Sequence, residues 1–223
     1  MGIQERKERE RSQRRQAILA SARSAFVKHG LATTSMERIA REAELAKGTL
    51  YLYFHSKDEL LMGLIAQDLE SLIKLLDNVV EQSMRADEKL FAAFVEFHRF
   101  SRENHFFFQV MTQLNIAEMV KGEHSKETLE DFTSVNQRVI GMIRRIVQEG
   151  LDDGVFVLEA SIDEVVIQLT VALKGSIVIL KNSMIPPHWV KQDERELLEQ
   201  IVRMLVRGIS SNSTSAVTTE LHQ

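Results

Sequence analysis

The scarcity of helix breakers is the feature that most limits what this chain can fold into. Proline occurs only at Pro186 and Pro187, and only 10 of the 223 residues are glycine. Proline interrupts helices and glycine weakens them, so long stretches without either residue favour long helices. Strand-like alternation of apolar and polar residues around Asn-Gly or Asp-Gly turns is missing. The sequence therefore predicts an all-α fold.

Composition places this all-α chain among soluble globular proteins. Hydrophobic residues make up 44% of the chain and charged residues 27%. The longest run without a charged residue, Asn104–Ala117, is too short to span a bilayer. The charged N-terminus lacks the apolar run of a signal peptide, and the absence of cysteine excludes disulfides and thiolate metal sites. We expect a soluble cytoplasmic protein.

The charges are distributed unevenly along the chain. Residues 1–57 hold 12 Lys and Arg against 6 Asp and Glu, a net charge of +6, whereas residues 58–223 carry a net charge of -10. A basic head on an acidic body favours binding of the head to a polyanion. The alternative is an N-terminal helix whose mixed charges are only solvated.

Short helices with recognisable start and stop signals follow one another in the basic head. A helix over about 11–29 ends at Gly30, and Thr34-Ser35-Met36-Glu37 resembles a capping box that opens the next helix, with Thr34 as the cap. A short helix over Lys47–Phe54 precedes a second box, Ser56-Lys57-Asp58-Glu59, at the start of a long helix. Two short helices braced by a third predict a helix-turn-helix.

The short helix predicted over Lys47–Phe54 exposes groups that suit contact with DNA. A cation, a hydroxyl, a phenol and a bare backbone can meet phosphates and base edges in a major groove. The residues predicted at this surface are Lys47, Gly48, Thr49, Tyr51, Leu52 and His55. Tyr53 is either a core aromatic or a further contact.

The run from Thr33 to Leu60, TTSMERIAREAELAKGTLYLYFHSKDEL, resembles the DNA-binding domain of TetR/AcrR-family transcriptional regulators. The resemblance covers roughly residues 11–62 and is carried by KGTLYLYF followed by SK. It implies a helix-turn-helix domain over 1–56 and a helical ligand-binding and dimerisation domain over 57–210. The tail over 211–223 is rich in Ser and Thr, so we expect it to be disordered. The resemblance also implies a homodimer that binds double-stranded operator DNA and a small-molecule effector. With the surface residues above, the expected DNA-binding residues are Thr34, Lys47, Gly48, Thr49, Tyr51, Leu52, Tyr53, His55 and Lys57.

Two positions depart from the family's pattern. Glu44 lies where the turn often has glycine, at a residue expected to need a positive φ. Ala46 replaces a frequent N-cap serine, so the following helix starts without a side-chain cap. The charged arm before Arg15 either extends the first helix or crosses the DNA backbone, and its alternating signs also fit a solvated helix end.

The acidic body is predicted to hold five more helices, at roughly 87–103, 105–119, 125–150, 161–183 and 193–209. Its aromatic and Met faces are either plain core or the walls of an effector pocket, as the resemblance implies. The expected ligand-binding residues are Phe94, Phe97, His98, Phe107 and Met111. Gln109, Gln113 and Asn136 are further candidates for polar contacts with an apolar or amphipathic ligand.

The helix that follows the box Ser161-Ile162-Asp163-Glu164 is apolar on more than one side. Such a helix is covered either by its own protomer alone or partly by a second subunit. The resemblance implies that the two C-terminal helices form a four-helix bundle with their copies. The expected dimer-interface residues are Val165, Leu169, Ala172, Ser176, Leu198, Ile201 and Leu205.

Enzyme motifs are missing from the sequence. No G-x-S-x-G, G-x-G-x-x-G or P-loop pattern occurs, and none of the seven histidines lies in an H-E-x-x-H motif. We expect no enzymatic activity, no cofactor and no metal. The prediction is a ligand-responsive regulator, a repressor released from a palindromic operator; the alternative is a helical small-molecule carrier that does not bind DNA.

Overall fold

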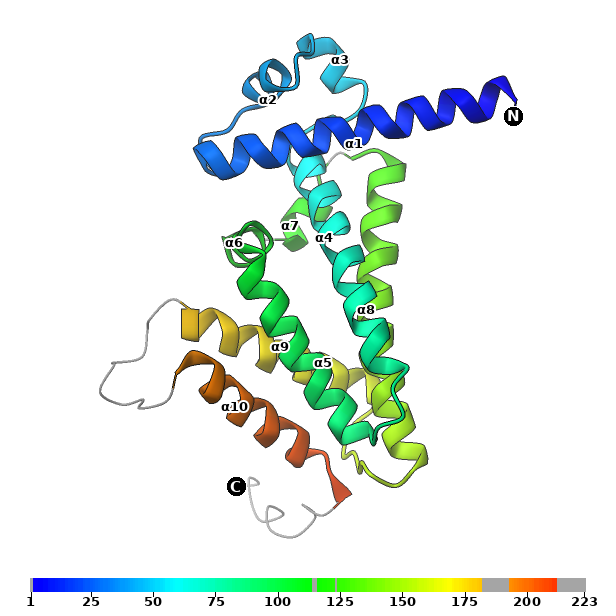
Figure 1. Ribbon diagram of the computed structural model, residues 1–223, viewed down its shortest axis with the longest axis vertical. Coiled ribbons are helices and arrows are strands. Elements are labelled where there is room, and N and C mark those ends of the chain that lie inside the picture. The colour runs from blue at the N-terminus through cyan, green and yellow to red at the C-terminus, as the bar shows by residue number, and fades with distance from the viewer. Residues whose placement is uncertain (1, 114–115, 123, 182–192, 212–223) are drawn as a thin grey trace, which may run out of the picture. The chain divides into compact units, whose positions relative to one another are not determined.

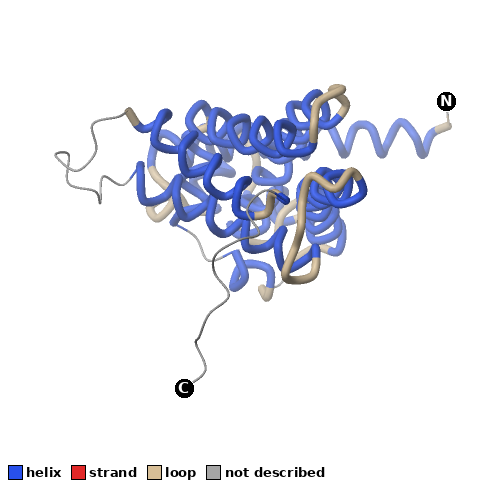
Figure 2. Tube along the Cα trace, turned by 90° about the horizontal axis from the view of Figure 1, so that it is seen from below, coloured by secondary structure: helices blue, strands red, loops and turns tan. Residues whose placement is uncertain are grey.

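The structure, a computed structural model, describes residues 2–113, 116–122, 124–181 and 193–211. These residues form helices joined by loops, with one isolated antiparallel bridge between Phe156 and Ser210, which confirms the all-α prediction (Figure 2). None of the described helices is long and apolar enough to cross a membrane. The predicted tail, apart from Ser211, lies outside the described residues.

The chain divides into two compact units. The first unit comprises residues 1–71 and 104–137, and the second comprises 72–103 and 138–223. Two long helices, α4 (Lys57–Val80) and α8 (Lys126–Asp152), each begin in the first unit and end in the second. The compact units therefore differ from the domains expected from the sequence, whose boundary after residue 56 stays a prediction.

The first unit contains the helix-turn-helix. Besides the starts of α4 and α8 it holds α1 (Ile3–His29), α2 (Met36–Glu42), α3 (Lys47–Tyr51), α6 (His105–Gln113) and α7 (Ile116–Val120) (Figure 1). Its core contains the fully buried side chains of Phe26, Ile39, Leu50 and Phe54. The ring of Phe26 stacks on that of Phe106 with centroids 6.0 Å apart. This burial holds α1 against both short helices and α6.

Three predicted helices in this unit have different bounds. The helix predicted over Lys47–Phe54 ends at Tyr51. The first helix begins at Ile3 and not near residue 11, so the charged arm is helical. The helix predicted over 105–119 is divided into α6 and α7. The arm contains many residues with good helix propensity, and alternating charges extend a helix without needing a core.

The second unit contains the ends of α4 and α8 together with α5 (Ala86–Glu103), α9 (Ile162–Lys181) and α10 (Glu194–Gly208), with α10 against both α5 and α9. The predicted box before α9 is confirmed, because Ser161 and Glu164 exchange hydrogen bonds of 3.3 and 3.0 Å. Gly150 in α8 allows the ring of Phe156 to pack closely, since a Cβ at this position would lie 2.1 Å from that ring.

Candidate DNA-binding site

The start of α2 selects a different hydroxyl from the one that the sequence suggested. Ser35 is the N-cap, and its side chain accepts a hydrogen bond of 3.3 Å from the Arg38 amide. Thr34 is only 2% exposed and donates to the carbonyls of Gly30, at 2.8 Å, and Ala25, at 3.3 Å. The prediction of Thr34 as cap was therefore wrong, and its buried hydroxyl does not face solvent where a phosphate would lie.

The turn between α2 and α3 has the backbone conformation expected from the sequence. Glu44 has a φ of 56°, which among the described residues makes it the one non-glycine residue with positive φ. The amide of the next residue, Leu45, donates to the carbonyl of Ala40 at 2.9 Å and closes the turn. The expectation for Glu44 is thus confirmed. The packed turn offsets the strain of about 1 kcal/mol that a side chain adds there.

Helix α3 presents a largely open surface. Ala46 is its N-cap and gives no side-chain hydrogen bond, as predicted. Lys47 and Gly48 are exposed, and a Cβ at Gly48 would meet no atom within 4 Å. Leu52, directly after α3, is 76% exposed, whereas Leu50 is fully buried and anchors the helix. The exposed face can therefore approach a groove without rearrangement of the core.

Lys47 is engaged by an acidic side chain of the neighbouring helix. Its Nζ forms an ion pair with Glu37 of α2 and lies 5.8 Å from the centre of the Tyr51 ring. The hydrogen bond from Lys47 lowers the pKa of the Glu37 carboxyl to about 2, and the same pair raises the pKa of Lys47. Both side chains are exposed, so a phosphate can replace the carboxylate as the partner of the ammonium.

The remaining predicted contact residues lie on either side of α3 and at the start of α4. Thr49, Tyr51 and Tyr53 are half-buried, which leaves both interpretations of Tyr53 open. His55 is exposed, and the half-buried Lys57 donates from Nζ to the carbonyl of Leu31 at 2.8 Å. Apart from Thr34, every residue predicted for DNA binding therefore has surface on the same compact unit. Their contacts with DNA stay predictions.

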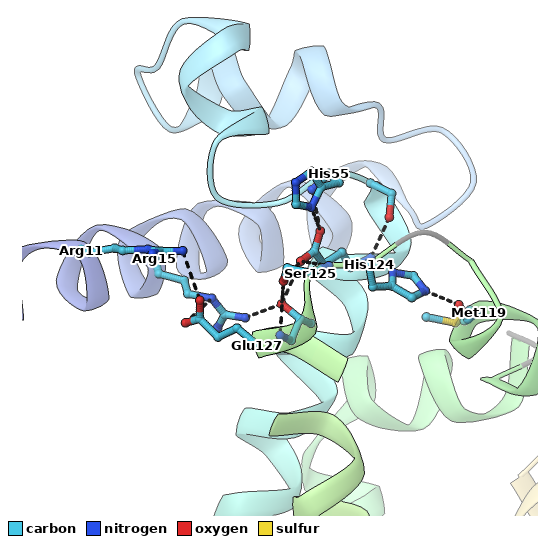
Figure 3. Close-up of polar contacts among 10 residues, drawn as sticks. Arg11, Arg15, His55, Met119, His124, Ser125 and Glu127 are labelled. Atoms are coloured by element: carbon cyan, nitrogen blue, oxygen red, sulfur yellow. Dashed lines mark hydrogen bonds and ion pairs between the residues drawn. The ribbon is translucent and has the colours of Figure 1, made fainter. Parts of the chain in front are cut away.

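A buried carboxylate beside this surface was missed by the sequence analysis. Glu59, in the first turn of α4, is fully buried and accepts five hydrogen bonds (Figure 3). The donors are the amide and Nδ1 of His55, at 2.6 and 3.0 Å, the amide of Ser125 at 3.1 Å, the Ser125 hydroxyl, and the Thr128 hydroxyl at 2.9 Å. The cluster joins the residues after α3 to the first turn of α8.

The predicted second capping box is correct in only one of its two bonds. The Glu59 amide donates to the Ser56 hydroxyl at 3.1 Å, as expected. The Glu59 carboxylate, however, accepts hydrogen bonds from His55 and from Thr128 of α8. Burial alone would raise the pKa of Glu59, yet the hydrogen bonds from Ser125, the His55 amide and Thr128 outweigh it and hold the pKa below its usual 4.5. Only the tertiary fold shows that this carboxylate is buried.

Two arginines of α1 reach the same end of α8. Arg11 donates to the Glu127 carboxylate at 3.2 Å, and Arg15 donates to the Thr128 hydroxyl at 2.7 Å (Figure 3). The Arg15 guanidinium also lies over the ring of Phe54, 4.7 Å from its centre. These contacts connect α1, the helix-turn-helix and α8 within one unit.

The predicted ligand-binding residues are divided between the two compact units. Phe94 and His98 are buried in the second unit, with Phe97 half-buried on the same helix, α5. Phe107 is buried and Met111 half-buried on α6, in the first unit. The structure does not bring the five into a single unit, and their role in ligand binding stays a prediction.

Polar candidates for the pocket already have partners inside their own units. Nε2 of His98 lies 3.4 Å from the Glu194 carboxylate, and burial lowers the pKa of this histidine despite that acid. Asn136 donates to the Phe132 carbonyl at 2.8 Å. The side-chain amide of Gln109 donates from Nε2 to Oε1 of Gln113 at 3.4 Å. Among these side chains, His98 is the one buried in a core.

The residues predicted for the dimer interface differ in their burial within one protomer. Val165, Leu169 and Leu198 are buried inside a single protomer, so they belong to its own core. The other four predicted residues, Ala172, Ser176, Ile201 and Leu205, are half-buried. The large apolar side chains of these helices that face solvent are Ile167, Val171 and Ile179 on α9, 60%, 64% and 46% exposed, and Met204 on α10, 65% exposed. The apolar periodicity did not distinguish the covered faces of these helices from the exposed ones, and the interface itself stays a prediction.

These features define a helix-turn-helix DNA-binding protein with a second helical unit. Residues 18–63 match the model of the family described as bacterial regulatory proteins, tetR family. The helix-turn-helix is therefore a DNA-binding domain of the TetR type. The prediction made from the KGTLYLYF motif is thus confirmed, and the alternative of a carrier without DNA binding is not favoured.

Similar proteins extend this comparison beyond the helix-turn-helix. The fatty acid metabolism regulator protein of Bacillus subtilis is 22% identical over 196 residues, which cover 86% of this chain and 93% of that protein. The structure is similar to FadR from Bacillus subtilis in complex with stearoyl-CoA, with a TM-score of 0.65, 19% identity, and coverage of 87% and 98%. It is also similar to the TetR-family regulator PfmR from Thermus thermophilus, with a TM-score of 0.60, 23% identity, and coverage of 85% and 97%.

Proposed function

We propose that this chain is a homodimeric repressor that leaves its operator when it binds an amphipathic ligand with a fatty acyl chain, of which acyl-CoA is the first candidate. The observation that carries the DNA-binding part is the exposed surface around α3 on a helix-turn-helix that matches the TetR family. The acyl-CoA part is supported by relatives whose names refer to fatty acid metabolism and by one that holds stearoyl-CoA.

Phosphate contacts supply most of the affinity in this proposal. Lys47 and Tyr51 meet the DNA backbone, while Gly48 and Thr49 approach the base edges. A single short recognition helix gives too little specific affinity, so two copies read half-sites about one helical turn apart, roughly 34–36 Å. The exposed apolar residues of α9 and α10 supply the surface on which these two copies meet.

The effector is recognised mainly through apolar contacts. Helix α5 carries several phenylalanines, and an acyl chain needs such walls, while a few polar groups orient its head. The effector releases DNA only if it binds the two states of the protein with different affinity. Such coupling is typically 1–3 kcal/mol, or about 5–150-fold in DNA affinity.

The test uses DNA from the region upstream of the chain's own gene and fluorescence anisotropy. The wild-type dimer should bind this DNA more tightly than a scrambled duplex of the same length. Stearoyl-CoA should then weaken operator binding by a factor in the range above, whereas coenzyme A without an acyl chain should not. No preference for the upstream DNA would refute the assignment of that operator. Preference without any effect of stearoyl-CoA would refute only the effector.

A further inference from the structure

The first part of α1 projects beyond the core that holds the rest of the helix. The first buried residue of α1 is Ile18, and residues 3–17 contain no buried side chain. Fifteen helical residues span about 22 Å at 1.5 Å per residue. Figure 1 shows α1 in blue continuing past α3 toward the N-terminus. We call residues 3–17 the overhang of α1.

The overhang exposes cations on the side that carries apolar residues farther along the helix. Lys7, Arg11 and Arg14 follow one another at i, i+4 and i+7, and Ile18, which is buried in the core, comes at i+11 on the same stripe. The stripe that packs against the helix-turn-helix core is therefore basic where it leaves that core. Solvation alone does not require the cations to gather on this side.

A groove lies along this basic stripe and reaches the helix-turn-helix. It has a volume of about 640 Å³ and is lined by Lys7, Glu10, Arg11, Gln13, Arg14, Ala17 and Tyr53. Tyr53 comes from the residues directly after α3, so the groove is continuous with the surface predicted to meet DNA. It belongs entirely to the first compact unit.

The cations near the groove differ in whether they form ion pairs with carboxylates. Arg11 is bound to Glu127 at 3.2 Å, and Arg6 neutralises Glu10 through an ion pair of 2.9 Å. Within the part of the chain that the structure describes, neither Lys7 nor Arg14 takes part in an ion pair. The groove thus keeps two cations whose charge is not balanced by a neighbouring carboxylate.

We propose that this groove holds the phosphodiester backbone of DNA beside the bases that face α3, with Lys7 and Arg14 each contacting a phosphate. The inference rests on the DNA-binding function proposed above. Lys7 and Arg14 are about 10 Å apart along the helix axis, the rise of about three base pairs, so both side chains can follow one strand. Because these contacts involve only phosphate, they raise the affinity for any duplex and carry no sequence preference.

The test measures the salt dependence of DNA binding for Lys7→Ala, Arg14→Ala and the double variant. Each phosphate contact contributes roughly 0.9 to the slope of log affinity against log salt, or about an eightfold change in affinity at 0.1 M salt. Each single variant should reduce the slope by about 0.9 per protomer, and the double variant by about 1.8. The reduction should be the same on upstream and scrambled DNA.

Arg9→Ala is the matched control, because this substitution also removes one positive charge but Arg9 lies on the opposite side of the overhang. It should leave the slope nearly unchanged. Circular dichroism of every variant checks that the overhang remains helical. Equal slopes for wild type and the double variant, or equal effects of Arg9 and Lys7, would overturn the inference while wild-type DNA binding stands. A wild-type protein that binds no DNA would overturn the proposed function as well.

Discussion

Replacing Glu59 with glutamine tests the role of the buried cluster at the start of α4. The two carboxylate oxygens divide the donors between them. One oxygen accepts from the amide and ring nitrogen of His55, and the other accepts from Ser125 and from the Thr128 hydroxyl. A glutamine amide keeps only one of these oxygens, and its NH2 group would face a donor, such as the His55 amide now held at 2.6 Å.

The expected loss in the free energy of unfolding is about 2–4 kcal/mol. A hydrogen bond to a charged acceptor contributes about 1.5–3 kcal/mol, and a buried donor left without an acceptor costs about 1–3 kcal/mol. Glu59→Gln weakens every bond of the cluster by removing the charge and leaves at least one buried donor unpaired. The side chain is fully buried, so water does not replace the lost acceptor.

Urea unfolding followed by circular dichroism measures this loss, and its pH dependence identifies the cause. The pKa of Glu59 is lowered in the folded state, so the stabilisation by its charge is present above the ordinary value of 4.5. It is lost as the pH falls below 4.5 and through the folded pKa. The difference between wild type and Glu59→Gln should therefore be constant from pH 7 to about 5 and should shrink below 4.5.

Glu127→Gln is the control, because it also removes one carboxylate charge beside the first turn of α8, where the cluster of Glu59 lies. Its ion pair with Arg11 is exposed, and such pairs contribute at most about 1 kcal/mol. A loss below about 1 kcal/mol for Glu59→Gln would refute the cluster as a source of stability. A loss that stays the same down to about pH 4 would show that the carboxylate charge is not its cause.

Four further substitutions test other parts of the structure. Glu37→Gln frees Lys47 from its ion pair and removes an anion near the phosphates, so anisotropy should show several-fold tighter binding to cognate and scrambled DNA alike. Protonation of Glu37 does not mimic this effect between about pH 5 and 8, because the pKa of its carboxyl is about 2. Gly48→Ala should lower operator affinity but leave the melting temperature equal or higher, because the added Cβ meets nothing within 4 Å and alanine favours helix by about 1 kcal/mol. A lower melting temperature would contradict the open surface of α3. Val171→Glu should give a folded monomer in sedimentation, whereas Leu169→Glu should lose the fold; a stable Val171→Glu dimer would exclude that face of α9 as the interface.

Local signals predicted the parts of the structure that depend on neighbours in the chain. The positive φ of Glu44 was expected from the resemblance, since the family often has glycine at this place in the turn, and the uncapped start of α3 follows from Ala46. The box at Ser161 joins groups only three residues apart, so nothing distant is needed to form it. These features are determined by the sequence because the atoms that make them are close in every compact conformation of the segment.

The choices that the sequence left undecided depend on which surfaces the fold covers. Thr34 and Ser35 both suit an N-cap, and only the burial of Thr34 assigns the cap to Ser35. A carboxylate at position 59 reads as a surface capping group until Ser125 and Thr128, more than sixty residues later, are placed beside it. In the same way, the apolar stripes of α9 do not reveal that Leu169 is covered by its own protomer while Val171 remains exposed. Helical periodicity determines which residues share a face, but burial is decided by segments far away in the chain, so only the tertiary structure could make these assignments.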